Sequence, residues 1–306
     1  YARRHGVPRW YDDARALAAD PEVDAVYVAT PPGAHLEGVL IAAAAGKPVY
    51  VEKPMARNTT ECEAMIRACA AAGQKLYVAY YRRAMPRFLK IKELLDSGAI
   101  GTLTGLHHRF ASPGHAGTAT IKHNGPQSTS WRAEAEISGG GLLLDIGAHA
   151  VDLLDYYGGP LQNVSGHAAR VATPGNVEDT AAMTFLTASG APGTATWNFA
   201  SLIKDDLLEI SGTAGRITCA VFNHEPIRLE TARGVEHFEF PAPEHIAQPL
   251  IQTVVDDLLG HGTCPSTGET ALRSTAVMDR ILDAYYGGRQ DAFWSRPHAW
   301  PGNTTR

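Results

Sequence analysis

The sequence predicts an α/β protein in two parts: a parallel sheet with helices, followed by an α+β part built on a large, mostly antiparallel sheet. Short β-prone runs alternate with helix-length segments up to about residue 80, as parallel crossovers require. After about residue 100, strand-like runs follow one another with few helices between them. The 306 residues exceed one ordinary domain, and we place the boundary between domains 1–84 and 85–306.

The N-terminal part contains three predicted strands, at residues 24–29, 48–51 and 75–80. One helix is expected from about Ala34 to Gly46, and a second from the capping box of Thr60 and Glu63 to Gly73. The opening letters YARRHGVPR resemble the tail of a further helix. The carboxyl ends of parallel strands form the ligand-binding edge of such a sheet, and here they carry the segments TPPGAH, EKP and AYYRR.

The C-terminal part contains eight predicted strands, at residues 103–111, 163–171, 178–186, 193–200, 206–211, 216–221, 227–231 and 235–240. Three helices are expected at residues 141–157, 245–260 and 268–286. Residues 112–129 are rich in Gly, Ser, Thr and His and are expected to form either a functional or a mobile loop. A sheet of this size leaves one face uncovered, so we expect a homo-oligomer, either a dimer or a tetramer.

The composition argues against several classes of protein. A net charge of −5 and a pI near 6.2 argue against nucleic acid as a partner. No apolar run approaches the roughly 20 residues that span a bilayer, so no membrane is expected. The four cysteines, Cys62, Cys69, Cys219 and Cys264, form no CxxC pair and no zinc-site spacing. We therefore expect buried, reduced thiols in a cytoplasmic protein, and no metal.

Two segments carry candidate chemistry. Lys53 follows a buried strand, where a lysine is costly unless it is paired or used in proton transfer, although it can also reach out to solvent. Glu52 is expected to be its ion partner or a cofactor contact. Three glycines precede a helix on which Asp145 and His149 lie four residues apart. The carboxylate would raise the pKa of the imidazole and orient it for acid/base work, or the two form an ordinary helical pair.

Other polar clusters are weaker candidates. His107, His108, His115 and His123 lack the support of a metal site and are expected on strand and loop surfaces. The basic stretch over residues 80–92 is expected to be a solvated helix face or to contact a ligand phosphate. Trp131 and Arg132 combine a stacking plane with a phosphate-binding guanidinium, or are a structural Trp beside a surface Arg.

The order of these motifs resembles the Gfo/Idh/MocA family, the relatives of glucose–fructose oxidoreductase and inositol dehydrogenase. The resemblance implies a Rossmann-like domain, an NAD(P) cofactor and hydride transfer to or from a sugar or polyol carbon. It also implies that Lys53 and the acid/base His149 are catalytic, with Asp145 as the partner of the histidine. The residues that the resemblance assigns to the cofactor are Thr30, Pro31, Pro32, His35, Glu52, Lys53, Trp131, Arg132 and, in preference to Tyr286, Tyr285.

The segments 248–252 and 264–269, together with Trp131 and Arg132, look like the 1,5-anhydrofructose reductase branch, which favours NADP. The family's G-x-G-x-x-G fingerprint is absent, so the Rossmann-like domain is expected to be incomplete, without its first strand–helix–strand unit. Either the chain is a truncated form, which we favour, or the protein lacks this unit. The alternative to an oxidoreductase is a non-catalytic relative that senses a sugar or cofactor or serves as an oligomeric binding protein, or an inactive truncated form.

Overall fold

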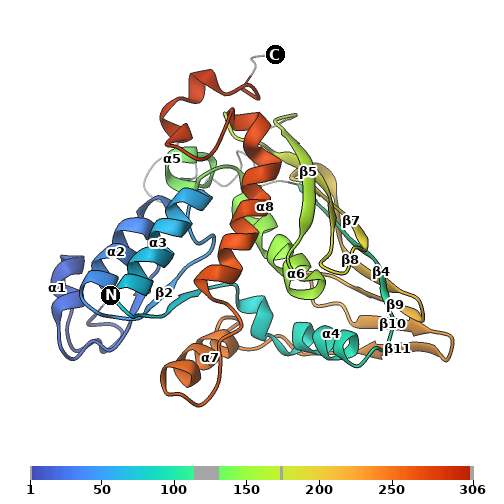
Figure 1. Cartoon of the computed structure of the whole chain (residues 1–306), viewed down its shortest axis with the longest axis horizontal. Helices are drawn as coiled ribbons and strands as arrows, with labels where there is room; N and C mark the ends of the chain where they lie inside the picture. The colour runs from blue at the N-terminus through green and yellow to red at the C-terminus, as the bar shows by residue number, and fades with distance from the viewer. Residues whose placement is uncertain (1, 114–130, 173–174, 304–306) are drawn as a thin grey trace.

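The computed structural model describes residues 2–113, 131–172 and 175–303. Within them the chain forms the two sheets that the sequence predicts, placed on either side of helix α8 (Gly268–Tyr286) (Figure 1). One sheet has three parallel strands in the order β1-β2-β3, and the other has eight strands in the order β11-β10-β9-β8-β4-β7-β6-β5. The predicted fold class, an α/β layer followed by a large and mostly antiparallel sheet, is confirmed.

The three-stranded sheet is the N-terminal layer. Its strands are β1 (Val26–Val28), β2 (Val49–Val51) and β3 (Leu76–Val78), and its helices are α1 (Ala14–Ala19), α2 (His35–Ala44) and α3 (Thr59–Ala71). All three residues of β2 are buried, as expected for the central strand of a parallel sheet. Two local predictions are wrong: residues 2–6 form turns rather than a helix end, and Asn58, which accepts a hydrogen bond from the Glu61 N–H, caps α3 in place of Thr60.

The eight-stranded sheet contains every strand predicted for the C-terminal part. The strands are β4 (Leu103–Pro113), β5 (Gln162–Ala169), β6 (Thr180–Leu186), β7 (Pro192–Asn198), β8 (Ala200–Gly212), β9 (Gly215–Cys219), β10 (Ile227–Thr231) and β11 (Gly234–Phe238). Strand β4 pairs in parallel with β7 and in antiparallel with β8. Alternate residues of β6 and β7 are buried and exposed, so one face of the sheet packs on the core while the other faces outward.

Helices cover the inner face of this sheet and join it to the first one. They are η2 (Tyr81–Ala84), α4 (Pro86–Asp96), η3 (Trp131–Ala133), α5 (Ala135–Ser138), the π-helical turn η4 (Leu143–Gly147), α6 (Ala148–Gly158), α7 (Gln248–Leu258) and α8. The stretch Ala135–Gly158 is apolar and long enough to span a membrane, but 78% of its most apolar window is buried inside the protein. This stretch is therefore part of the hydrophobic core.

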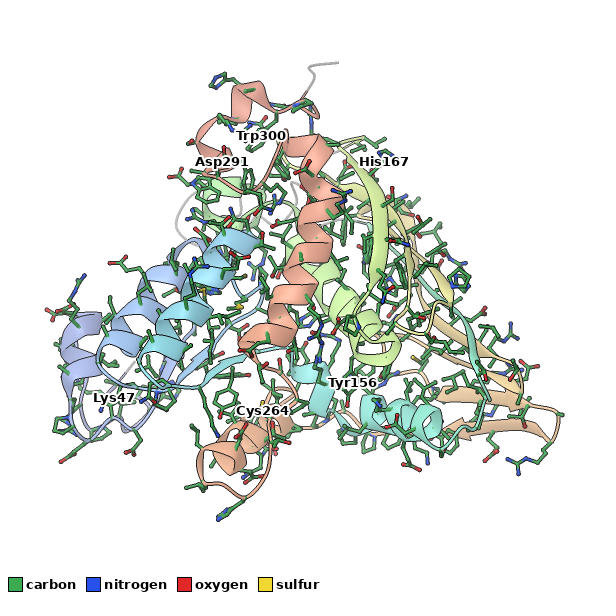
Figure 2. The ribbon with its side chains drawn as sticks, viewed as in Figure 1. Lys47, Tyr156, His167, Cys264, Asp291 and Trp300 are labelled. Carbon is green, nitrogen blue, oxygen red and sulfur yellow. The ribbon has the colours of Figure 1, made fainter. Side chains whose placement is uncertain are left out.

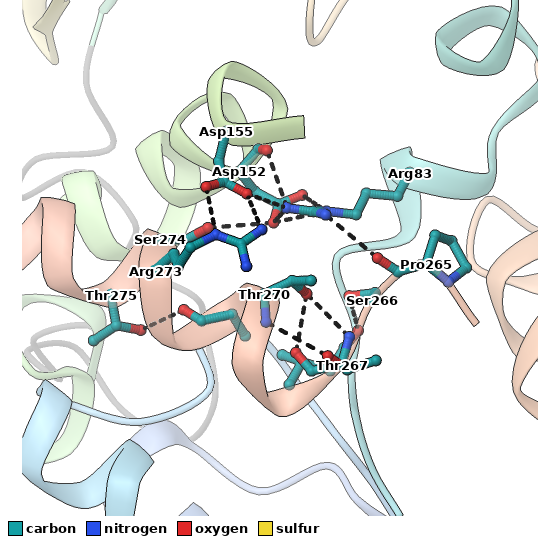
Figure 3. A network of polar contacts seen from close by, with 12 residues as sticks. Arg83, Asp152, Asp155, Pro265, Ser266, Thr267, Thr270, Arg273, Ser274 and Thr275 are labelled. Atoms are coloured by element: carbon teal, nitrogen blue, oxygen red, sulfur yellow. Dashed lines mark hydrogen bonds and ion pairs between the residues drawn. The ribbon is translucent and has the colours of Figure 1, made fainter. Parts of the chain in front are cut away.

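A buried network of charges holds η2 between α6 and α8 (Figure 3). The Arg83 guanidinium donates to both carboxylate oxygens of Asp152, at 2.8–3.0 Å, and to Asp155 at 3.1 Å. Arg273 of α8 donates twice to Asp155, at 2.8 Å. Because Asp152 lies one turn after His149 on α6, this network fixes the helix that carries the predicted catalytic histidine.

The four cysteines are free and buried, as predicted. Cys264 lies beside α7, below the start of α8 (Figure 2), where its Sγ accepts a hydrogen bond from Thr253. Burial raises the pKa of Cys69 to about 11 and that of Cys219 to about 12. These thiols stay protonated at neutral pH, which disfavours nucleophilic chemistry at either residue.

Candidate active site

Lys53 stands at the carboxyl end of β2 and is paired rather than reaching out to solvent. Its Nζ lies 2.7 Å from the backbone oxygen of Asp145 and 2.7 Å from Asp145 Oδ1. The side chain is 15% exposed. The ion partner is therefore Asp145 and not Glu52, whose carboxylate accepts hydrogen bonds from the Tyr27 hydroxyl at 2.6 Å and from the Lys53 backbone N–H at 3.1 Å.

Two cations hold the Asp145 carboxylate. Besides Lys53, the Arg132 Nε donates to Asp145 Oδ2 at 2.8 Å, and the Arg132 guanidinium stacks over Trp131, 4.3 Å from the ring centre. Burial alone would raise the pKa of Asp145, but the charges and hydrogen bonds of Lys53 and then of Arg132 outweigh burial and lower it. Asp145 is therefore an anion at neutral pH that fixes both the lysine and the Trp131–Arg132 pair.

The predicted pairing of Asp145 with His149 is wrong. Asp145 lies in the π-helical turn η4, whose hydrogen bonds join residues five apart, so a spacing of four does not place these side chains one above the other. No described residue hydrogen-bonds His149 Nδ1. The pKa of His149 is not raised but lies well below its usual value, first because of burial and then because of the nearby charges of Arg82 and Lys53. The imidazole is neutral at neutral pH.

His149 and Lys53 line one cavity of about 740 Å³, together with the end of β4 and residues 204–206 of β8. His149 meets the rings of Tyr81 and Phe222 edge-on, at centroid distances of 4.9 and 6.4 Å. With Nδ1 buried, Nε2 is the ring nitrogen left to face the cavity. A space with aromatic walls and a few charged and polar groups suits a small polar ligand that has both hydroxyls and apolar faces.

The loop after β1 reaches the loop after β2 through His35. The buried ring of His35 lies 2.7 Å from the Thr30 carbonyl through Nε2, and 3.1 Å from the carbonyls of Pro54 and Met55 through Nδ1. The ring therefore ties the two loops together and is not itself free to bind a cofactor. Pro31 and Pro32 follow Thr30 at the start of η1 (Pro32–Ala34), so the predicted TPP segment does lie at the carboxyl edge of the sheet.

The last helix meets the glycine run through Tyr286 rather than Tyr285. The Tyr286 hydroxyl donates to the Glu178 carboxylate, which accepts the Gly141 N–H at 2.9 and 3.0 Å. The Tyr285 hydroxyl donates to the Asn176 carbonyl at 2.8 Å, and Tyr285 does not line the cavity. A cofactor contact by Tyr285 stays a prediction.

Sequence reasoning missed part of the cavity wall. The prediction of a solvated helix face is wrong for Arg82, Arg83 and Arg87, which are buried and hydrogen-bonded within the protein. It holds only for Lys90 and Lys92 on α4, which form ion pairs with exposed acidic residues of the same helix. His108 is not on the surface either: it is buried beside Trp197. His115 and His123 lie outside the described residues. The position of AYYRR at a strand end was the available signal for Arg82, which lines the cavity next to His149.

Comparison with known families gives two matches, which together span most of the chain. Residues 1–80 match an oxidoreductase family with an NAD-binding Rossmann fold, and residues 88–218 match the GFO/IDH/MocA C-terminal domain. Oxidoreductase P35 of Formosa agariphila is 34% identical over 279 residues, which cover 91% of this chain and 84% of that protein. The 1,5-anhydro-D-fructose reductase of Ensifer adhaerens is 28% identical and covers 94% of this chain and 85% of its own.

Solved structures have the same fold. The aldose-aldose oxidoreductase of Caulobacter crescentus, in complex with glycerol, superposes with a TM-score of 0.78 at 25% identity, covering 92% of this chain and 84% of that one. A levoglucosan dehydrogenase in complex with NADH and levoglucosan gives a TM-score of 0.81 at 23% identity, with coverage of 92% and 83%. The second likeness concerns the fold alone.

Proposed function

Because the chain belongs to the Gfo/Idh/MocA family of NAD-binding oxidoreductases, we propose that it moves a hydride between a nicotinamide cofactor and a hydroxyl- or carbonyl-bearing carbon of a sugar, polyol or related compound. The observation that carries this proposal is the meeting of Lys53 and His149 in one cavity at the carboxyl edge of the parallel sheet. A nearby lysine and a neutral histidine are the groups that proton transfer at an alcohol oxygen requires.

The described residues fit the nicotinamide end of such a cofactor. The TPP segment and Glu52 stand at adjacent strand ends, where dinucleotides bind in parallel sheets. The stacked Trp131–Arg132 pair faces them from the second part of the chain, anchored through Asp145 to Lys53. These residues would hold the cofactor, which supplies or accepts the hydride when bound.

The protein's own residues then handle the proton and the substrate oxygen. An ammonium group has three N–H donors, and Lys53 uses its Nζ for two hydrogen bonds to Asp145. No described residue accepts a hydrogen bond from the remaining donor, which can therefore bind the substrate oxygen. His149 takes the hydroxyl proton on Nε2 during oxidation and returns it during reduction, while Asp145 acts as a positioning residue for Lys53.

Cofactor choice is the finer part of the proposal. The features that resemble the 1,5-anhydrofructose reductase branch favour NADP. In contrast, the name of the scyllo-inositol 2-dehydrogenase (NAD(+)) of Bacillus subtilis, which is 28% identical, specifies NAD. Parallel titrations with NADH and NADPH measure which one binds more tightly.

We also propose a homo-oligomer in the cytoplasm. Two large apolar side chains of β8, Leu202 and Ile203, are 83% and 71% exposed, and a partner copy would cover them. Light scattering of wild type and the Leu202→Lys/Ile203→Lys double variant tests the assembly. A monomeric wild type would refute it.

Turnover of a panel of sugars and polyols with NAD(H) and NADP(H) tests the proposed function. Lys53→Met and His149→Asn are each expected to lower kcat by about 10²–10⁴-fold, whereas Lys75→Met is expected to leave it unchanged. Lys75 is the matched control because it also pairs with an aspartate, Asp257, but far from the cavity. Cofactor and sugar binding without turnover would instead support a non-catalytic relative.

A further inference from the structure

Arg82 is a buried cation that lines the active-site cavity and forms no ion pair with a carboxylate of the described residues. It is 7% exposed, and its Nε donates to the Val221 carbonyl at 3.2 Å while Nη1 donates to the Tyr81 hydroxyl at 2.9 Å. The guanidinium lies against two rings, 4.9 Å from the centre of Tyr81 and 4.7 Å from that of Phe222. Nη2 has no hydrogen-bond partner among the described residues, yet it is not sealed from solvent, so it faces the cavity.

The other buried arginines differ from Arg82 in this respect. Arg83 and Arg289 each bind an aspartate. Arg87 also lacks a carboxylate, but both of its terminal nitrogens donate to backbone carbonyls, and it does not line the cavity. Arg82 therefore differs from the other buried arginines in having a buried guanidinium whose Nη2 is open. A ligand with acceptor oxygens would take up the hydrogen bonds that Nη2 can donate.

Two cations of the cavity wall lie beside the proposed catalytic histidine. Lys53 and Arg82 both lie close enough to His149 to act on it electrostatically. The carboxylate on this wall, Asp145, is already held by Lys53 and Arg132. Asp145 is thus paired with Lys53 and Arg132 and forms no ion pair with Arg82.

Two aspartates of β8 also line the cavity, and Asp206 acts on Arg82 electrostatically, but the oxygens of both aspartates have other hydrogen-bond or ion-pair partners. Asp206 accepts three backbone N–H groups at 2.7–3.1 Å, and Asp205 forms an ion pair with Arg109. At the exposed rim, Lys204 and Glu225 offset one another. Among the described residues, Nη2 of Arg82 is therefore a charged donor that stays open to a ligand beside the reacting groups.

We propose that the substrate is a sugar acid, an aldonate or a uronate, whose carboxylate binds Arg82 while the reacting hydroxyl or carbonyl meets Lys53 and His149. This inference rests on the proposed function and adds the substrate class. The open edge of a guanidinium binds both oxygens of a planar carboxylate. The Tyr81 hydroxyl accepts from Arg82, so its own proton is available for a further hydrogen bond to the ligand.

The test compares matched neutral and acidic substrates: D-glucose and D-glucitol against D-gluconate and D-glucuronate, with D-glucose 6-phosphate as the phosphate-bearing arm. The acids are expected to have the higher kcat/KM. Arg82→Gln should lower kcat/KM for the acids about 10–150-fold, mainly through KM, since a charged hydrogen bond is lost. The neutral sugars should change by less than about 3-fold.

Arg87→Gln is the matched control, because Arg87 binds the same segment, residues 220–225, without reaching the cavity. The Arg87→Gln change should alter kcat/KM by the same factor for acidic and neutral substrates. If Arg82→Gln does not fold, Arg82→Lys keeps the charge but loses the two-pronged geometry and should still weaken acid binding. A preference for neutral sugars, a preference for the phosphate, or equal losses for both substrate classes in the Arg82 variants would overturn the inference.

Calorimetric titration with D-gluconate separates this inference from the proposed function. Lys53→Met is expected to bind gluconate but not to turn it over, whereas Arg82→Gln binds it weakly. If no substrate is turned over but gluconate binds and this binding depends on Arg82, the proposed enzyme activity is refuted and the anion site is kept. If sugars are turned over but gluconate binding is unchanged in Arg82→Gln, the proposed enzyme activity is kept and the anion site at Arg82 is refuted.

Discussion

Replacing Asp152 with asparagine is expected to lower the free energy of unfolding by about 3–5 kcal/mol, the cost of removing one partner from a buried ion pair. The network of Figure 3 joins two arginines and two aspartates, so its charges balance. The Asp152→Asn change leaves two cations facing Asp155 alone. Since Arg83 is 3% exposed, water cannot solvate the extra charge. For a chain of 306 residues the loss corresponds to a fall in Tm of roughly 5–8 °C.

Urea denaturation followed by circular dichroism measures this effect. Asp291→Asn is the control, because the Asp291–Arg296 pair is exposed, with Asp291 at 66%, and should contribute at most about 1 kcal/mol. The double change Arg83→Met/Asp152→Leu removes both charges and should recover much of the loss. An Asp152→Asn loss no larger than the Asp291→Asn loss, or a double variant less stable than Asp152→Asn alone, would show that the buried charges do not stabilise the fold as a balanced network.

Three further predictions follow from buried groups. Burial lowers the pKa of His108 to about 3, so the unfolded chain takes up a proton that the folded chain cannot as the pH falls below 6.5. The free energy of unfolding should therefore fall by about 2 kcal/mol between pH 7 and 5. In His108→Phe, the urea midpoint should fall correspondingly less over the same pH range. Burial and two nearby cations hold the pKa of His149 well below its usual value, so kcat/KM for oxidation should stay level as the pH falls through 6.5; a bend at or above 6.5 would contradict the assignment. A Cβ on Gly141 would lie 2.2 Å from the Glu178 carbonyl oxygen. Gly141→Ala should therefore lower the free energy of unfolding by about 1–3 kcal/mol in the same denaturation assay and slow turnover. Gly262→Ala, where a Cβ meets only Asp256 at 3.7 Å, should leave both unchanged.

Local patterns were sufficient to predict most of the fold. The strands after residue 100 alternate buried and exposed side chains, which is a periodicity that short windows of sequence contain. Helix α8 has the predicted bounds because a capping residue, Thr267, precedes it and Gly287, with a φ of 68°, ends it. The short helix α1 was missed because its six residues, ARALAA, have no apolar periodicity that indicates a helix.

The geometry of the site was less predictable, because it depends on contacts between distant residues. Lys53 and Asp145 are 92 residues apart, and only the packing of the two sheets brings them together. The spacing of Asp145 and His149 predicts a pair only if the segment is an α-helix, and the π-helical turn changes which side chains face one another. The family resemblance named Lys53, Asp145 and His149 together, and all three line one cavity, but neither the resemblance nor the spacing gave their hydrogen-bond partners.

Helix α8 limits how this protein can be recombined with others. It packs on α3 of the parallel layer and also on α6 and β5 of the large sheet, and Thr267 just before it forms an isolated β-bridge to Tyr77. A segment near the end of the chain therefore completes the layer formed near its beginning. A chimaera that exchanges only residues 1–84 would leave the new layer against a foreign helix. Transfer of cofactor or substrate preference between relatives should therefore move α8 together with the N-terminal layer.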